Sequence, residues 1–142
     1  MTESAAVFAR TLLLDAGLFV AAIDRTDEHH AWAKRTLPKL SGRVVTCEAC
    51  IAEALHLLEN APAAITALGR LLERMEVVPV LPTDLPAVFG CIADFAPNMD
   101  LADGCLVVLQ QHIPRSIVVT TDHRDFATYR VPFLSPHGIF AQ

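Results

Sequence analysis

Short apolar runs alternate with amphipathic segments along most of the chain. Four runs rich in Leu, Val, Ile and Thr have the length of buried strands, at residues 11–14, 43–46, 77–80 and 116–121. Between them, apolar positions recur at helical spacing and predict helices at about 28–37, 47–59, 62–74, 83–93 and 100–111. Gly17 breaks the pattern after the first run, and the proline-containing stretch 131–142 predicts one edge strand.

The order of these elements indicates an α/β fold. Strands separated by helices are typical of βαβ units, which build a parallel sheet with helices on its faces. The runs at 11–14 and 116–121 lack polar alternation, as expected of a sheet that is covered on both faces. Asp27 and Thr83 are suited to cap the helices that follow them. In such sheets ligands bind at the carboxyl ends of the strands.

Composition narrows the class of protein. The chain has 142 residues, a length typical of a single domain, which we expect to span residues 1–142. Apolar residues make up 53% and charged residues 19%, which excludes an intrinsically disordered chain and favours self-association. The net charge of −5 argues against a protein that simply coats nucleic acid, but not against an enzyme whose acidic cleft binds cations.

Neither a membrane span nor an export signal is predicted. The longest apolar run, residues 11–22, is interrupted by Asp15 and is shorter than the ~20 residues of a membrane span. Residues 1–10 contain Glu3 and lack the basic start and apolar core of a signal peptide. We therefore expect a cytoplasmic protein whose four cysteines are reduced thiols.

Cys47 and Cys50 form a CxxC pair at a strand-to-helix junction. A thioredoxin-like redox pair would occupy such a position, where the helix N-terminus lowers the pKa of a thiol. No aromatic residue stands directly before Cys47, however, and the parallel βα pattern begins before it. We therefore favour two small residues packed in the core, and a zinc site is disfavoured because no second CxxC or His pair has ligand spacing.

Two aspartates directly follow the most apolar strands. Asp15 comes after the first run and Asp122 after the run at 116–121, so parallel strands would bring both carboxylates to the same edge of the sheet. Aspartate is also a common turn residue after a strand, so either one alone would carry little information. Together they indicate a site at this edge.

Further acids stand on the predicted helices. Asp100 and Asp103 are three residues apart and share one helix face, and Asp100 is readily explained as a cap. Asp103 lies among apolar residues, where an unpaired carboxylate is costly, so it needs a partner such as a cation. Glu48 and Glu53 both flank the apolar stripe of their helix, and helical spacing alone does not choose between them.

Converging carboxylates indicate a divalent metal. They repel one another unless a cation lies among them, and an all-oxygen set suits Mg²⁺ or Mn²⁺ better than zinc. Such an ion lowers the pKa of bound water and supports in-line attack on phosphorus. No glycine-rich phosphate loop of the Walker type is present, which argues against hydrolysis of nucleotide triphosphates.

Four segments, taken in order, resemble the PIN-domain ribonucleases, in particular the VapC-like toxins of bacterial type II toxin–antitoxin pairs. They are residues 12–21 (LLLDAGLFVA), 45–54 (VTCEACIAEA), 99–104 (MDLADG) and 119–126 (VTTDHRDF). In that family an aspartate after the first strand, a helical glutamate and two later aspartates hold one or two Mg²⁺ or Mn²⁺ ions. The resemblance implies that the corresponding ligands here are Asp15, Glu53, Asp103 and Asp122.

The resemblance also implies roles for neighbouring residues. Asp100 is the expected helper among the metal ligands, Thr120 is expected to orient a carboxylate or water, and Asp125 to act as a cap or a supporting acid. Arg124, beside the proposed site, is a candidate for contact with an RNA phosphate. One position departs from the family: many members carry Ser or Thr two residues after the first aspartate, where this chain has Gly17.

Fold and partners follow from the same resemblance. It implies a PIN-like three-layer sandwich, with a mostly parallel sheet of four to five strands between helices. It further implies an RNA substrate, a homodimer, and a small antitoxin whose tail enters the cleft, where its Arg or Lys would suit an acidic site.

Two alternatives remain open at the level of sequence. His123, beside Asp122, either contacts substrate or lies in a solvated loop, which we favour, and His112 and His137 are scattered elsewhere. The functional alternative is a non-catalytic PIN-fold module that binds a protein partner or RNA. Gly17 and the acidic charge favour that module, whereas the complete set of four carboxylates favours a nuclease.

Overall fold

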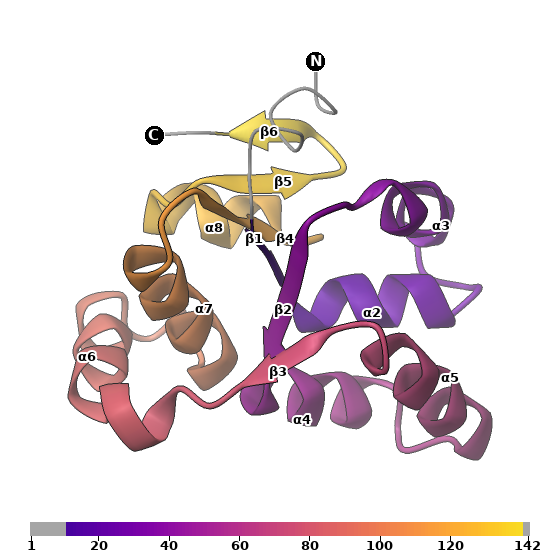
Figure 1. Cartoon of the computed structure of the whole chain (residues 1–142), viewed down its shortest axis with the longest axis horizontal. Helices are drawn as coiled ribbons and strands as arrows, with labels where there is room; N and C mark the ends of the chain where they lie inside the picture. Colours follow the sequence, from indigo (N-terminus) through magenta and orange to yellow (C-terminus); the bar gives the residue numbers. More distant parts are fainter. Residues whose placement is uncertain (1–10, 141–142) are drawn as a thin grey trace.

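The computed structural model describes residues 11–140, and within this range six strands form one sheet (Figure 1). The strands are β1 (Thr11–Leu14), β2 (Arg43–Cys47), β3 (Glu76–Val78), β4 (Ser116–Val119), β5 (Phe133–Ser135) and β6 (Gly138–Phe140). Their order is β3-β2-β1-β4-β5-β6. All neighbouring pairs are parallel except β5 and β6, which are antiparallel.

Helices cover both faces of this sheet, giving the three layers expected from the sequence. The α-helices of the described range are α2 (Ala16–Ile23), α3 (His30–Thr36), α4 (Glu48–Leu57), α5 (Pro62–Leu72), α6 (Leu81–Asp94), α7 (Leu101–His112) and α8 (His123–Tyr129). A short 3-10 helix, η1 (Leu37–Lys39), follows α3. Figure 1 shows α2, α3 and α5 on one side of the sheet and α6, α7 and α8 on the other. The helix α4 follows the carboxyl end of β2 and contacts both α2 and α7.

Alternation along the strands divides the core into two halves. Leu13 and Val118 pack with α7 on one face, whereas Leu12, Leu14 and Val119 pack with α2 on the other. All five side chains are buried. This arrangement explains why Leu12–Leu14 and Ile117–Val119 are uninterrupted apolar runs: each of these side chains, whichever way it points, meets a layer of helices.

The sheet has one strand more than the upper end of the expected four to five. The C-terminal stretch forms two short strands, with Ser135 paired to Gly138 across a two-residue turn. Gly138 has a φ of 119°, a conformation that glycine adopts without steric cost. The hairpin was underestimated because each strand is only three residues long and Pro132 and Pro136 flank β5.

Two helices were missed because each begins directly after an acid that reads as a turn residue. Asp15 caps α2, its Oδ1 accepting a hydrogen bond from the Ala16 backbone N–H (2.8 Å). Asp122 caps α8, its Oδ1 accepting from the Asp125 backbone N–H (3.0 Å). Gly17 therefore lies inside the first turn of α2 and ends no element.

Two predicted caps were wrong. Asp27 accepts a hydrogen bond from the His29 backbone N–H, but this bond closes a loop turn, and α3 begins only at His30. The helix α6 begins at Leu81, ahead of Thr83, and its backbone leaves helical geometry at Asp84. Pro86 follows this kink and has no N–H for the preceding turn.

The ends of two strands also differ from the sequence prediction. The third strand starts one residue earlier than expected and stops at Val78, because Pro79 cannot donate to a neighbouring strand. The strand β4 stops at Val119, two residues before the predicted end. Residues 1–10, over which we expect no signal peptide, lie outside the described range. Within residues 11–140, no helix has the length and apolarity needed to cross a membrane.

Candidate metal centre

Asp15 stands at the carboxyl end of the central strand β1. Its backbone N–H bonds to the Val119 carbonyl (3.0 Å), so β1 and β4 remain paired up to this residue. Only 5% of Asp15 is exposed. The Thr120 hydroxyl donates to Asp15 Oδ2 (2.6 Å), and the Ala16 N–H occupies Oδ1. The position of the carboxylate is therefore fixed by the strand, the adjacent helix and one threonine.

Asp122 lies at the same edge of the sheet, as expected for two acids that follow parallel strands. The buried Thr120 joins the two acids, because its Oγ1 donates to Asp15 and accepts from the Asp122 backbone N–H (2.9 Å). The Asp122 side chain is exposed and caps α8 through Asp125. Asp125 is half-buried, and burial, followed by contact with Asp122, raises its pKa to about 6.

Asp103 enters the site from α7, which contacts β1, β2 and β4. It is 8% exposed, and the Tyr129 hydroxyl donates to its Oδ2 (2.8 Å). This bond offsets part of the cost of burying the carboxylate among apolar residues, a cost from which the sequence predicted that Asp103 has a partner. Asp100 caps α7 with its Oδ1 accepting from the Asp103 N–H (2.8 Å), and its exposed side chain faces the same acidic cluster.

The structure distinguishes the two glutamates of α4. Glu48 lies in the first turn and is exposed to solvent. Glu53 is half-buried and interacts electrostatically with Asp100, Asp15 and Asp122. Glu53 is therefore the glutamate that α4 brings to the cluster.

The five acids act on one another electrostatically. Burial is the main cause that raises the pKa of Asp15 to about 6, of Glu53 to about 7 and of Asp103 to about 8. Repulsion adds to burial in each case: Asp100 acts on all three, and Asp122 acts on Asp15 and Glu53. Protons or a cation must therefore offset the negative charge that the fold concentrates here.

The donor set fits a hard divalent cation, although residues 11–140 contain no group of three or more His, Cys, Asp or Glu side chains already spaced to hold one ion. All five side chains offer carboxylate oxygens, the ligands that Mg²⁺ and Mn²⁺ prefer. Two of them, Asp15 and Asp103, are buried at a cost that a cation would remove.

Gly17 is explained by a residue from another strand end. A Cβ atom at position 17 would overlap the Thr121 hydroxyl oxygen. A hydroxyl therefore stands beside Gly17, although it comes from the segment after β4. The missing Ser or Thr at position 17 leaves no gap in this region.

Arg124 lies in the first turn of α8 and is exposed. It lines two surface hollows at once. One, which we call the tyrosine hollow, also includes Phe95, Asn98, Asp125, Thr128 and Tyr129. The other, the histidine hollow, is formed with His29, Thr121, Asp122, His123, His137 and two acids of the α2–α3 loop. Both hollows adjoin residues of the acidic cluster.

The PIN-domain family model matches residues 12–131, which include all five acids. The chain belongs to the PIN-domain family. A comparison with curated protein sequences gives no significant match. The observed PIN fold agrees with the fold expected from the sequence motifs, apart from the extra strand described above.

Two solved structures with a similar fold are a VapC toxin and a VapBC complex. One is VapC20 of Mycobacterium tuberculosis, described as a sarcin-ricin-loop-cleaving toxin, with a TM-score of 0.71 and 17% identity over 82% of this chain and 94% of that chain. The other is VapBC2 of Rickettsia felis bound to a DNA fragment from its promoter, with a TM-score of 0.60 and 14% identity over 83% and 92% of the two chains. At these identities the likeness establishes the fold.

Two features of this PIN domain were not found from the sequence. Tyr129 is the chain's single tyrosine, and the need of Asp103 for a partner was the signal that pointed to such a donor. Cys105 lies beside Cys47. The prediction that Cys47 and Cys50 pack in the core is confirmed: both are buried, with their sulfur atoms 3.6 Å apart.

Proposed function

We propose that this PIN domain is a Mg²⁺- or Mn²⁺-dependent endoribonuclease that hydrolyses RNA phosphodiesters, and that it is the toxin of a type II toxin–antitoxin pair. The main support is the convergence of five carboxylates at the carboxyl edge of the sheet, in a chain of the PIN family. The fold shared with VapC20, which is described as a sarcin-ricin-loop-cleaving toxin, supports the choice of RNA and of the toxin role.

The five acids share the binding of the metal in the proposed mechanism. Asp15, Glu53, Asp103 and Asp122 would hold the metal, with Asp100 assisting. When bound, the metal supplies Lewis-acid activation of water and of the phosphodiester. The protein contributes fixed carboxylate positions, because Thr120 holds Asp15 and Tyr129 holds Asp103.

Arg124 is the proposed contact for an RNA phosphate. Arg124 lines both hollows, and a guanidinium is well suited to bind phosphate oxygens. The acidic net charge of −5 is compatible with this role, because the bound metal would reverse the local sign of the potential.

Exposed apolar side chains support the proposal that the chain binds protein partners. Leu85 and Phe89, four residues apart on α6, are 46% and 58% exposed, and Leu101 at the start of α7 is 40% exposed. Leu57 on α4 and Ile65 on α5 form a second set, 52% and 45% exposed. We assign the larger set on α6 and α7 to a second copy of the chain and the set on α4 and α5 to the antitoxin. We further propose a single cytoplasmic domain over residues 1–142.

The decisive experiment is cleavage of total cellular RNA by the purified protein. Discrete fragments should form with Mg²⁺ or Mn²⁺, disappear with EDTA, and disappear in the Asp15→Asn and Asp122→Asn variants. Asp94→Asn, at the exposed end of α6, is the control and should cut like the parent. If the folded, metal-loaded parent cuts nothing but still binds RNA or a protein partner, the non-catalytic module replaces this proposal.

A further inference from the structure

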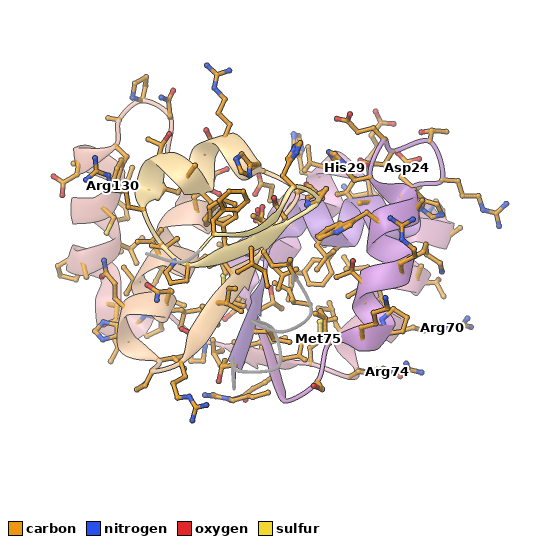
Figure 2. The ribbon with its side chains drawn as sticks, turned by 90° about the horizontal axis from the view of Figure 1, so that it is seen from above. Asp24, His29, Arg70, Arg74, Met75 and Arg130 are labelled. Carbon is orange, nitrogen blue, oxygen red and sulfur yellow. The ribbon has the colours of Figure 1, made fainter. Side chains whose placement is uncertain are left out.

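Three of the chain's six histidines, which lie in separate elements, meet at the histidine hollow. His29 comes from the loop between α2 and α3, His123 is the first residue of α8, and His137 belongs to the turn between β5 and β6. Figure 2 shows His29 at the end of the α2–α3 loop nearest this hairpin, with Arg130 at the far end of α8. The proposed metal site does not use any of the three.

The hollow is preorganised on its hairpin side. His123 packs edge-on against Phe140 and Phe133, with ring centroids 4.4 and 5.4 Å away, and its Nδ1 lies 3.3 Å from the Ser135 hydroxyl. The same hydroxyl oxygen accepts from the His137 backbone N–H (3.1 Å). The rings of His123 and His137 are 4.9 Å apart. Two aromatic rings are thus held in place beside open surface.

The opposite side of the hollow is acidic. Asp27 accepts from the His29 backbone N–H, and Glu28 lies 3.5 Å from the His29 ring, so both acids adjoin this histidine. Carboxylates at this side repel a phosphate group, which argues against a second phosphate as the occupant. They do accept hydrogen bonds from the exocyclic amino group of a base.

The hollow is continuous with the acidic cluster. Asp122 belongs to both, and Arg124, the proposed phosphate contact, lines the hollow as well. An RNA strand whose scissile phosphate reaches Asp122 would therefore place a neighbouring base against the histidines. Bases stack on aromatic side chains in most sites that recognise single-stranded RNA.

We propose that the histidine hollow binds one unpaired nucleobase of the RNA, next to the scissile phosphate, and favours a base that carries an amino group. This inference rests on the proposed nuclease function and names the part of the substrate that the hollow binds. His29 and His137 provide ring surface, and Asp27 and Glu28 accept from the amino group. Cytosine, adenine or guanine is therefore bound in preference to uracil, which has no amino group.

The test measures binding of fluorescently labelled hexamers of cytidylate, adenylate and uridylate to the full chain, with Ca²⁺ in place of Mg²⁺ to suppress cutting. The parent should bind the cytidylate and adenylate hexamers at least about tenfold more tightly than the uridylate hexamer. The His29→Ala/His137→Ala double variant should lose this preference and bind the cytidylate hexamer about tenfold more weakly. His56→Ala, an exposed histidine on α4, is the matched control and should bind like the parent.

A second measurement guards against an unfolded variant. Ring signals of His29 and His137 in the parent's NMR spectrum should shift when the cytidylate hexamer is added, whereas those of His56 should not. Equal binding of the three hexamers, or unchanged binding by the double variant, would overturn the nucleobase site even if the parent cuts RNA. Preference for the cytidylate hexamer without any RNA cleavage would instead retain the site and reject the nuclease. If an arginine-bearing peptide binds only when both histidines are present, while the hexamers bind without them, the hollow would be assigned to a protein partner.

Discussion

At the scale of single residues, the pair Gly17 and Thr121 gives a clear test of packing at the site. In the parent, Gly17→Ala should be neutral or destabilising, because the new methyl group overlaps the Thr121 hydroxyl, and overpacking typically costs about 1–3 kcal/mol. With Thr121→Ala in place, the same change should stabilise by roughly 0.5–1 kcal/mol, because Ala is a better helix residue than Gly. Urea unfolding of the four proteins gives both values. Equal effects of Gly17→Ala in the two backgrounds would show that the residues do not interact.

Tyr129 is a positioning residue for Asp103, and its removal should alter the pH dependence of activity. The hydroxyl hydrogen bond lowers the pKa of Asp103, so Tyr129→Phe should raise that pKa further above its value of about 8. Activity near pH 7 should fall roughly 10- to 100-fold, given ~1.5–3 kcal/mol for a hydrogen bond to a charged group. The loss should shrink as pH rises above the raised pKa of Asp103, because the carboxylate then ionises without the hydrogen bond. A pH-independent loss of activity would contradict this role.

At the scale of elements, α4 carries an internal control. Glu53→Gln should abolish metal-dependent cleavage, because Glu53 is the glutamate that α4 directs to Asp15 and Asp100. Glu48→Gln, five residues earlier on the same helix and exposed, should leave the rate within about twofold of the parent. Rates measured on one RNA substrate with Mg²⁺ decide the matter. Equal losses in both variants would indicate a general effect on α4 and not a ligand role for Glu53.

The exposed face of α6 gives a second test at this scale. Phe89→Ser should convert a dimer into a monomer, because a 58% exposed Phe is the largest apolar side chain on that face. Ile65→Ser, on α5, should leave the dimer intact and weaken antitoxin binding. Light scattering after size-exclusion chromatography gives the mass of each variant. A parent that is already monomeric at micromolar concentration would reject the assignment of α6 to a second copy.

At the scale of the whole molecule, the acidic cluster should make the metal-free protein less stable as pH rises. Asp15 and Asp103 have pKa values raised from 3.8 to about 6 and about 8, so the folded state holds protons that the unfolded state has released. The stabilisation that these two protonated groups provide is therefore complete below about pH 4, and it is lost progressively as pH rises toward 8. For Asp15 alone the rise corresponds to roughly 3 kcal/mol.

Thermal unfolding in EDTA at pH 5 and pH 8 measures this effect. The melting temperature should be lower at pH 8, and Mg²⁺ should raise it more at pH 8 than at pH 5, because the ionised carboxylates bind the cation. The Asp15→Asn/Asp103→Asn double variant should lose most of both dependences. A parent that is equally stable at the two pH values in EDTA would show that the ionised acids do not destabilise the folded state.

The sequence by itself determined the α/β class, the two-sided burial of the central strands, and the edge at which Asp15 and Asp122 meet. These features depend on local patterns: unbroken apolar runs predict strands covered on both faces, and a residue that follows a parallel strand lies at its carboxyl end. The choice of Glu53 came from the resemblance to the family, since helical spacing left Glu48 equally possible.

Only the tertiary structure decided which distant residues meet. The contact of Tyr129 with Asp103, the overlap of Thr121 with position 17, and the meeting of His29 with His123 join residues that lie 26 or more positions apart in the chain. No local pattern encodes such contacts, because they depend on the order of the strands and on the packing of α7 and α8 over one face of the sheet. Side-chain periodicity fixes which way each element faces, whereas the assembly of the elements fixes what each side chain touches.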